Sequence, residues 1–186
     1  MKKSLGNKPL IYPMPVLIIT TYNEDGTANA MTAAWGGVCD YTKISIIIDK
    51  GHKTTKNLLA QKALTVSIAD KDHIVQADYL GIISGKNITD KVTSCGLHYH
   101  KSQTVNAPVI DEFPLTLECK VLSYDESTER LIAEVVNTLA DDSILTDDKI
   151  DLAKFNPITY DTMNHHYISL GEKVGTAFCD GKKLQR

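Results

Sequence analysis

Asn29-Ala30-Met31-Thr32-Ala33-Ala34-Trp35 is the segment from which the organisation of this chain can be worked out. We expect it to form a strand whose small and polar side chains leave room beside the backbone for a flat ligand. The segment Gly51-His52-Lys53-Thr54-Thr55-Lys56-Asn57 then predicts a turn that enters a short helix rich in cations and hydroxyls, which suits an anion. A planar group at one end and an anionic group at the other describe a nucleotide-like cofactor.

The flanking sequence indicates a mainly β fold. Residues 16–22 are β-branched, and the turn signal Asn23-Glu24-Asp25-Gly26 joins them to the segment 29–35 as a hairpin. Glycines at 36 and 37 would loosen the backbone or let another group approach it closely. Further strands are predicted at 44–49, 64–68, 108–110, 115–121 and 131–139, helices at 54–61 and 72–85, and a helical turn at 89–97.

About seven strands against two or three short helices predict a small antiparallel barrel with short helical insertions, as one domain over residues 1–186. The strand at 44–49 is nearly all apolar and is expected to be covered on both faces. Residues 64–68 alternate apolar and polar, which is typical of a half-buried strand. Asp72 is the expected cap of the second helix.

Composition narrows the class of partner. Twenty basic and 23 acidic side chains give a formal net charge of −3, with no clustered run of either sign, so nucleic acid is not an expected partner. We find no signal-peptide pattern, and the apolar runs are too short to cross a bilayer, so a soluble cytoplasmic protein without a membrane partner is expected. The four dispersed cysteines are expected as reduced thiols.

Lys53, Thr54 and Thr55 at the start of a helix could bind a phosphate, because helix N-termini present unpaired N–H groups. An ordinary helix capped by threonine, with solvated lysines, is the alternative. Trp35, the only tryptophan, shares a strand face with Met31 and could form an apolar wall for a planar ring or pack in the core.

The histidines and cysteines raise the question of a metal site. His98 and His100 lie near Cys95, and His165-His166 lie near the C-terminus, but no spacing typical of zinc ligands supports a site, so none is predicted. Cys39 is expected to be buried and inert. Glycine-rich nucleotide loops and the Gly-x-Ser-x-Gly motif do not occur, which disfavours a Rossmann domain and serine hydrolysis.

Several short motifs follow one another in a specific order along residues 13–184. In chain order they are Pro15-Val16, Asp25-Gly26, the segment 29–35, His52-Lys53-Thr54-Thr55-Lys56-Asn57, Ser84-Gly85, Lys91, Gly96-Leu97, Ala107-Pro108-Val109-Ile110, Leu117-Glu118-Cys119, Leu170-Gly171-Glu172-Lys173-Val174-Gly175 and Gly181-Lys182. In this order they resemble the flavin reductase-like family, and most closely its flavoredoxin branch.

The resemblance implies a split β-barrel that binds FMN and works as a homodimer, with each flavin near the subunit interface. It implies that the segment 29–35 and the loop to Cys39 line the isoalloxazine ring. The implied cofactor-binding residues are Asn29, Met31, Thr32, Ala33, Ala34, Trp35, Cys39, Lys53, Thr54, Thr55 and Lys91. Two departures from the family pattern, Tyr41-Thr42-Lys43 and Ser67-Ile68-Ala69-Asp70, bear on substrate access rather than on the fold.

Two oxidoreductase functions follow from this resemblance: an FMN electron carrier reduced by a partner protein, or a flavin reductase that takes electrons from NADH or NADPH. Neither requires a catalytic acid or base, because the flavin carries the redox chemistry. Backbone N–H groups between Thr32 and Trp35 are expected to face the ring. The alternative is a non-enzymatic sensor on the same barrel that holds haem through His98, His100 or His165.

Overall fold

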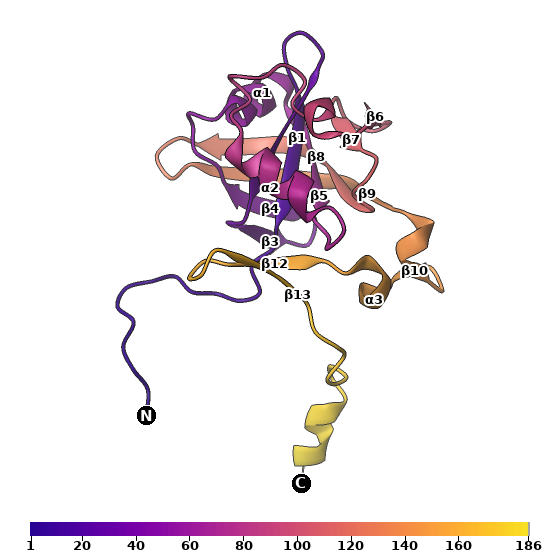
Figure 1. Cartoon of the computed structure of the whole chain (residues 1–186). Coiled ribbons are helices and arrows are strands. Elements are labelled where there is room, and N and C mark those ends of the chain that lie inside the picture. Colours follow the sequence, from indigo (N-terminus) through magenta and orange to yellow (C-terminus); the bar gives the residue numbers. More distant parts are fainter. Residues whose placement is uncertain (186) are drawn as a thin grey trace.

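A computed structural model describes residues 1–185 of the chain. Most of the described elements are strands (Figure 1). The strands are β1 (Leu17–Tyr22), β2 (Ala28–Ala33), β3 (Gly36–Asp40), β4 (Lys43–Ile47), β5 (Ala63–Ile68), β6 (Tyr99–Lys101), β7 (Pro108–Ile110), β8 (Leu115–Asp125), β9 (Arg130–Ala140), β10 (Leu145–Thr146), β11 (Lys149–Ile150), β12 (Ile158–Asp161) and β13 (His166–Ser169). The helices are α1 (Lys53–Gln61), α2 (Ile74–Ile82) and α3 (Leu152–Phe155), with 3₁₀ turns η1 (Thr93–Cys95), η2 (Asp142–Ile144) and η3 (Asp180–Leu184).

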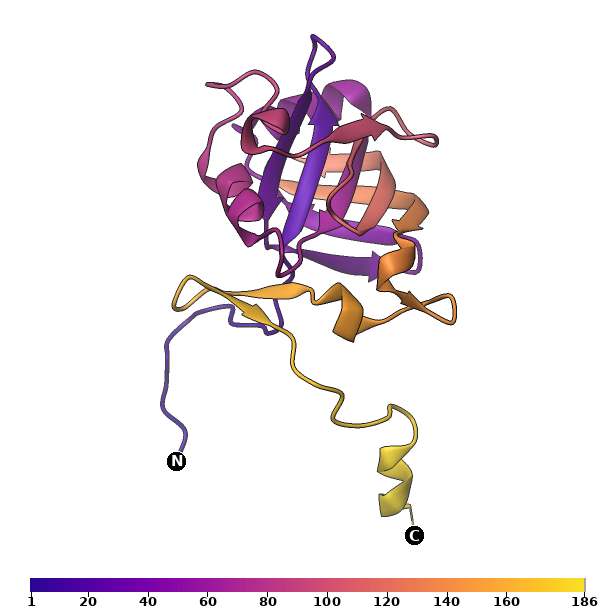
Figure 2. The ribbon, with the colours of Figure 1, turned by 45° about the vertical axis from the view of Figure 1, so that its right-hand side comes forward.

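One seven-stranded sheet has the order β2-β1-β5-β8-β9-β4-β3, and all its pairs are antiparallel. Its two edge strands, β2 and β3, are consecutive in the chain and are joined only by Ala34 and Trp35. The sheet must therefore curl until its two edges meet at this link, as the ribbon shows in Figure 2. The backbone N–H of Ile47 donates to the Trp35 carbonyl at 2.8 Å and ties the link to β4.

Side chains of β1 alternate between two apolar clusters, one on each face of the sheet. Leu17 and Ile19 join a cluster with residues of β4, β5, β8 and β9, which the curled sheet encloses, and Leu58 of α1 belongs to the same cluster. Val16 and Ile18 join the cluster on the outer face, where Ala77 and Leu80 of α2 also pack. Helix α1 thus packs mainly on β1 and α2 on β2, and the two helices belong to different apolar clusters.

The mainly β architecture and the two main helices agree with the sequence, but several local expectations were wrong. The pattern at residues 36–40 did not predict β3. Strand 44–49 is not covered on both faces, because Ile46 and Ile48 are buried while Ile47 is 43% exposed. Strand 64–68, expected to be half-buried, is instead buried on both faces at 64–67, since Thr65 and Ser67 are also fully buried.

The start of α2 also differs from the expectation. Asp72 does not cap the helix. Instead, Asp70 Oδ1 accepts hydrogen bonds from the backbone N–H groups of Asp72 and His73, at 2.9 and 3.0 Å. A carboxylate two residues earlier in the chain therefore organises the turn into the helix.

The β12–β13 hairpin lies beside the curled sheet, and both chain termini extend away from it (Figures 1 and 2). The hairpin is joined to the sheet through the bridge between Pro15 and Thr159, and Tyr12 donates to Asp161 at 2.7 Å. Among residues 1–185, no helix is both long and apolar enough to span a membrane.

Candidate functional site

A groove runs past the link between β2 and β3 as two joined cavities. The first, which we call the apolar cavity, has a volume of about 410 Å³ and includes residues 31–35 in its lining. The second, the basic cavity, has a volume of about 380 Å³ and is lined in part by Lys53, Lys86 and Lys91. The two cavities share five lining residues, namely Met31, Asp49, His52, Gly81 and Ile82. They therefore adjoin each other and form one groove.

One wall of the apolar cavity comes from β2 and from the link that follows it. Met31, Ala33 and Ala34 present small or flexible side chains, and Trp35 stands at the mouth with 51% of its surface exposed. The alternative that Trp35 packs in the core is therefore wrong. The β1–β2 ladder ends at the Leu17–Ala33 pair, so the N–H groups of Ala34 and Trp35 lie beyond it.

The apolar cavity also has a polar wall, which comes from α2 and from the β12–β13 hairpin. The Tyr167 hydroxyl donates to Asp78 Oδ1 at 2.9 Å, and the hydroxyl oxygen of Tyr160 is 2.7 Å from His165 Nδ1. Burial, reinforced by the Asp78 carboxylate, raises the pKa of Tyr167 to about 12. This hydroxyl therefore stays protonated at neutral pH and acts as a donor.

The basic cavity begins where β2 meets the start of α1. Asn29 is 1% exposed, and its amide Nδ2 donates to the buried Thr54 hydroxyl at 2.8 Å. Because Thr54 Oγ1 already accepts this bond, its own hydrogen remains free to donate to an acceptor in the cavity. Gly85 lies on the other side of the Asn29 amide, where a Cβ atom would come within 2.1 Å of Asn29 Oδ1.

Positive charge and helix geometry both favour an anion in the basic cavity. The first-turn N–H groups of α1 have no partner within the helix. Lys91 is only 3% exposed, and its Nζ donates to the Leu80 carbonyl at 2.7 Å, which leaves further donors on the ammonium. Burial lowers the pKa of Lys91 to about 8, because a buried ammonium without a counter-charge is destabilised. An anion bound beside Lys91 would offset this destabilisation.

Nine of the eleven cofactor residues expected from the sequence line the groove: Asn29, Met31, Thr32, Ala33, Ala34, Trp35, Lys53, Thr54 and Lys91. The Thr32 hydroxyl donates to the Ala77 carbonyl and so joins β2 to α2. Thr55 does not line the groove, because its buried hydroxyl donates to the Asp49 carbonyl at 2.7 Å and closes the turn before α1.

Cys39 lies outside the groove. It is on the edge strand β3 and is exposed rather than buried, so the expectation of a buried thiol was wrong. Residues 37–40 of this edge strand are exposed on both faces, which sequence could not show because β3 itself was not recognised.

Sequence reasoning missed two contributors to the site. The first is the segment 81–86, which covers the end of α2 and the residues after it. Only Ser84-Gly85 in this segment had a signal, as one of the motifs quoted for the resemblance. The second is the polar wall formed by Asp78, Tyr160 and Tyr167. His165 was noticed only as a possible iron ligand.

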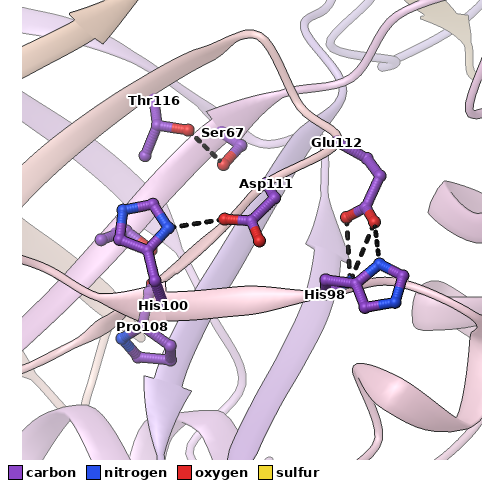
Figure 3. A network of polar contacts seen from close by, with 8 residues as sticks. Ser67, His98, His100, Pro108, Asp111, Glu112 and Thr116 are labelled. Carbon is purple, nitrogen blue, oxygen red and sulfur yellow. Dashed lines mark hydrogen bonds and ion pairs between the residues drawn. The ribbon is translucent and has the colours of Figure 1, made fainter.

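Two other histidines lie away from the groove, on and beside β6 (Figure 3). His98 Nδ1 is 2.7 Å from Glu112 Oε1, and His100 Nδ1 is 2.5 Å from Asp111 Oδ1. Residues 1–185 contain no group of three or more side chains placed to hold a metal ion. Of the three histidines weighed as haem ligands, only His165 lines the groove.

Comparison with known proteins adds a family match and similar solved structures. The family model described as "Flavin reductase like domain" matches residues 10–169. The chain is similar to the flavoredoxin of Desulfovibrio vulgaris (Miyazaki F), with 36% identity, a TM-score of 0.93, and coverage of 98% of this chain and 100% of that one. It is also similar to flavoredoxin from Methanosarcina acetivorans, with 26% identity, a TM-score of 0.88, and coverage of 99% of each chain.

A third structure extends the likeness of fold. The FMN-binding domain of a flavin reductases-like enzyme from Shewanella baltica OS155 is 19% identical, with a TM-score of 0.79 and coverage of 87% of this chain and 88% of that one. At this identity the likeness concerns the fold alone.

Proposed function

The chain belongs to the flavin reductase-like family, and on that premise we propose that it is an FMN-binding oxidoreductase that accepts electrons on the flavin and passes them on. Its mainly β, curled antiparallel sheet with short helices matches the FMN-binding split barrel, as the sequence predicted. Two flavoredoxins match it at 36% and 26% identity over nearly the whole of both chains.

The groove formed by the two adjoining cavities carries this proposal. FMN joins a flat tricyclic ring to a phosphate through a ribityl chain, so it needs a planar apolar space that leads into an anion site. The apolar cavity of about 410 Å³ opens into the basic cavity of about 380 Å³ through their shared lining. Neither the apolar cavity nor the basic cavity alone would select this ligand.

Residues of the chain have distinct parts in holding the cofactor. Met31, Ala34 and Trp35 would contact the ring, and the N–H groups beyond the β1–β2 ladder would donate to its polar edge. Lys53, Thr54 and Lys91 would hold the phosphate. The bound flavin supplies the electron-accepting chemistry, and the protein supplies position and electrostatics.

Two versions of this function differ in the electron donor. A reductase takes electrons directly from NADH or NADPH, whereas a carrier is reduced by a partner protein. We favour the carrier, because the flavoredoxin similarity covers nearly the whole chain. The exposed mouth at Trp35 leaves the ring end of the groove open to either donor.

Rapid mixing of the FMN-loaded protein with NADH and, separately, NADPH tests the choice. The carrier version predicts that neither nucleotide bleaches the flavin absorbance on a catalytic timescale, while dithionite does. Bleaching by either nucleotide would establish the reductase version. A red-brown protein that binds haem instead of FMN would support the sensor alternative.

We also propose that the protein works as a homodimer. Val38 is 83% exposed and Tyr41 is fully exposed, both beside the edge of the sheet formed by β3. Covering these apolar side chains with a second copy would remove them from water. Light scattering of the purified protein would give a mass of two chains, and a mass of one chain at micromolar concentration would contradict this proposal.

A further inference from the structure

We propose that His165 is a positioning residue of the groove, and that it donates a hydrogen bond from Nε2 to the molecule in the apolar cavity, with Tyr160 fixing its tautomer. The inference deepens the proposed function and rests on it, because the expected occupant of that cavity is a flavin ring. Neither the family pattern quoted for this sequence nor the expected cofactor residues include His165.

The contact between Tyr160 and His165 occupies Nδ1, so Nε2 is the ring nitrogen left for another partner. The Tyr160 hydroxyl lies 2.7 Å from His165 Nδ1, and both residues line the apolar cavity. A phenolic hydroxyl is the better donor of the two groups, and an unprotonated imidazole nitrogen is the better acceptor. The neutral ring then carries its hydrogen on Nε2, and a protonated ring carries one there as well. Nε2 is therefore a donor in both states.

The hairpin turn holds His165 in an unusual backbone conformation. Its φ is +57°, in the left-handed region that residues other than glycine seldom adopt. Its N–H donates to the Asp161 carbonyl at 2.8 Å and closes the turn. Backbone of this kind persists where the surroundings impose it.

Asp161 supplies those surroundings. Its carboxylate accepts from Asn164 Nδ2 at 2.6 Å, from the Tyr12 hydroxyl at 2.7 Å and from the Met163 N–H at 3.0 Å. These bonds hold the pKa of Asp161 at about 2, so the anchor stays charged across the working pH range. A turn fixed at both its backbone and its carboxylate presents His165 in one orientation.

The opposite wall explains what the donor would meet. The side chains of Met31, Ala33 and Ala34 offer only apolar contact to a ring, and the donors on this wall are the backbone N–H groups beyond the β1–β2 ladder. A planar heterocycle carries carbonyl oxygens and ring nitrogens at its edge, and these accept hydrogen bonds. A donor on the hairpin side would hold a second point on the edge of such a ring and so help to select one in-plane orientation.

The test compares binding of FMN and riboflavin to the ligand-free protein, because riboflavin shares the ring and lacks the phosphate. His165→Ala should weaken both ligands by the same factor of about 3 to 10, the size expected for one neutral hydrogen bond. His165→Gln, whose amide can also donate, should recover part of the loss. His100→Ala is the matched control, since His100 is exposed, pairs with Asp111 and lies outside the groove (Figure 3).

Nitrogen-15 NMR of the imidazole gives a readout that a purely structural role would not change. The neutral ring of wild type should show the tautomer with hydrogen on Nε2, and Tyr160→Phe should shift the population toward the other tautomer. Added riboflavin should perturb the Nε2 resonance of His165 and leave that of His100 unchanged.

Equal affinity of wild type and His165→Ala for both ligands would overturn the inference while leaving FMN binding intact. So would a wild-type ring that carries its hydrogen on Nδ1. If wild type binds neither FMN nor riboflavin, the proposed function fails instead, and the inference falls with it.

Discussion

The Asn29 amide donates to the Thr54 hydroxyl at 2.8 Å, and this bond joins strand β2 to the first turn of α1. Both side chains are almost completely buried, at 1% and 2% exposure. The bond therefore connects the segment that forms the apolar wall with the segment that forms the basic cavity. It also leaves the Thr54 hydroxyl hydrogen free to donate to another acceptor.

Breaking this bond should cost stability as well as affinity. Asn29→Ala leaves a buried hydroxyl without its donor, so the free energy of unfolding should fall by about 1–3 kcal/mol. Urea unfolding of Asn29→Ala, Thr54→Val and the double variant would give the coupling energy between the two residues. A coupling energy near zero would show that the two side chains act independently.

Gly85→Ala should disturb the same amide from the other side. An added Cβ would lie 2.1 Å from Asn29 Oδ1 and 3.5 Å from Lys53 Cβ, so the basic cavity must rearrange. We expect stability to fall by about 1–3 kcal/mol, as in other overpacked sites, and FMN affinity to fall with it. Gly37→Ala is the control, because a Cβ there would have no atom within 4 Å. Equal behaviour of the two variants would contradict the close packing at Gly85.

Replacing Lys53 and Thr54 together by alanine should weaken FMN binding by about 2–4 kcal/mol, since two contacts to a charged phosphate are lost and their effects are not fully additive. Riboflavin affinity should change little. Lys56→Ala is a suitable control, because Lys56 is on the same helix but binds Glu24 at 2.7 Å. Full FMN occupancy of the double variant after dialysis would place the phosphate elsewhere.

The buried Lys91 should make the stability of the ligand-free protein and its FMN affinity change in opposite directions with pH. Its pKa is lowered from 10.5 to about 8 by burial, so between these values the folded chain binds fewer protons than the unfolded chain. The stability of the ligand-free protein should therefore rise with pH from about 8 upward. FMN affinity should fall over the same range, because the phosphate dianion favours the protonated lysine.

Lys91→Met should remove both dependences and weaken FMN at pH 7. Isothermal titration with FMN between pH 7 and 9.5 and urea unfolding of the ligand-free protein over the same range would measure them. The lower limit avoids protonation of the phosphate, which begins near pH 6. An FMN affinity of wild type that stays constant from pH 7 to 9.5 would show that Lys91 does not hold the phosphate.

The spacing of apolar residues and the turn signals in the sequence predicted those helices and strands in which buried side chains recur at a regular interval. Helix α1, the β1–β2 hairpin and the long pair β8–β9 have turn signals or apolar spacing that can be read directly. Strand β3 could not be recognised, because Gly36 and Gly37 have low strand propensity. The structure explains Gly36: a Cβ would lie 2.7 Å from Leu17 Cδ1, at the place where the sheet closes on itself. The sequence had suggested a close approach at these glycines, but not to which residue.

The candidate site was predictable on one wall only. Asn29, Lys53 and Thr54 belong to contiguous segments with a recognisable order, so a resemblance could identify them. Asp78 and Tyr167 are 89 residues apart, and only the folded hairpin brings them together across the cavity. Thr55 shows the opposite kind of error, a residue predicted for the site that does not belong to it. Its residue type suits a phosphate, but its buried hydroxyl donates to the Asp49 carbonyl in the turn before α1.

Titration of the ligand-free protein with FMN and, in parallel, with riboflavin tests the central claim most directly. A groove that holds a flavin ring at one end and its phosphate at the other predicts saturable binding of both, with FMN tighter by at least about 30-fold, the lower end of 2–4 kcal/mol. Equal affinities would mean that the basic cavity does not hold the phosphate, and absence of binding by either would contradict the account as a whole.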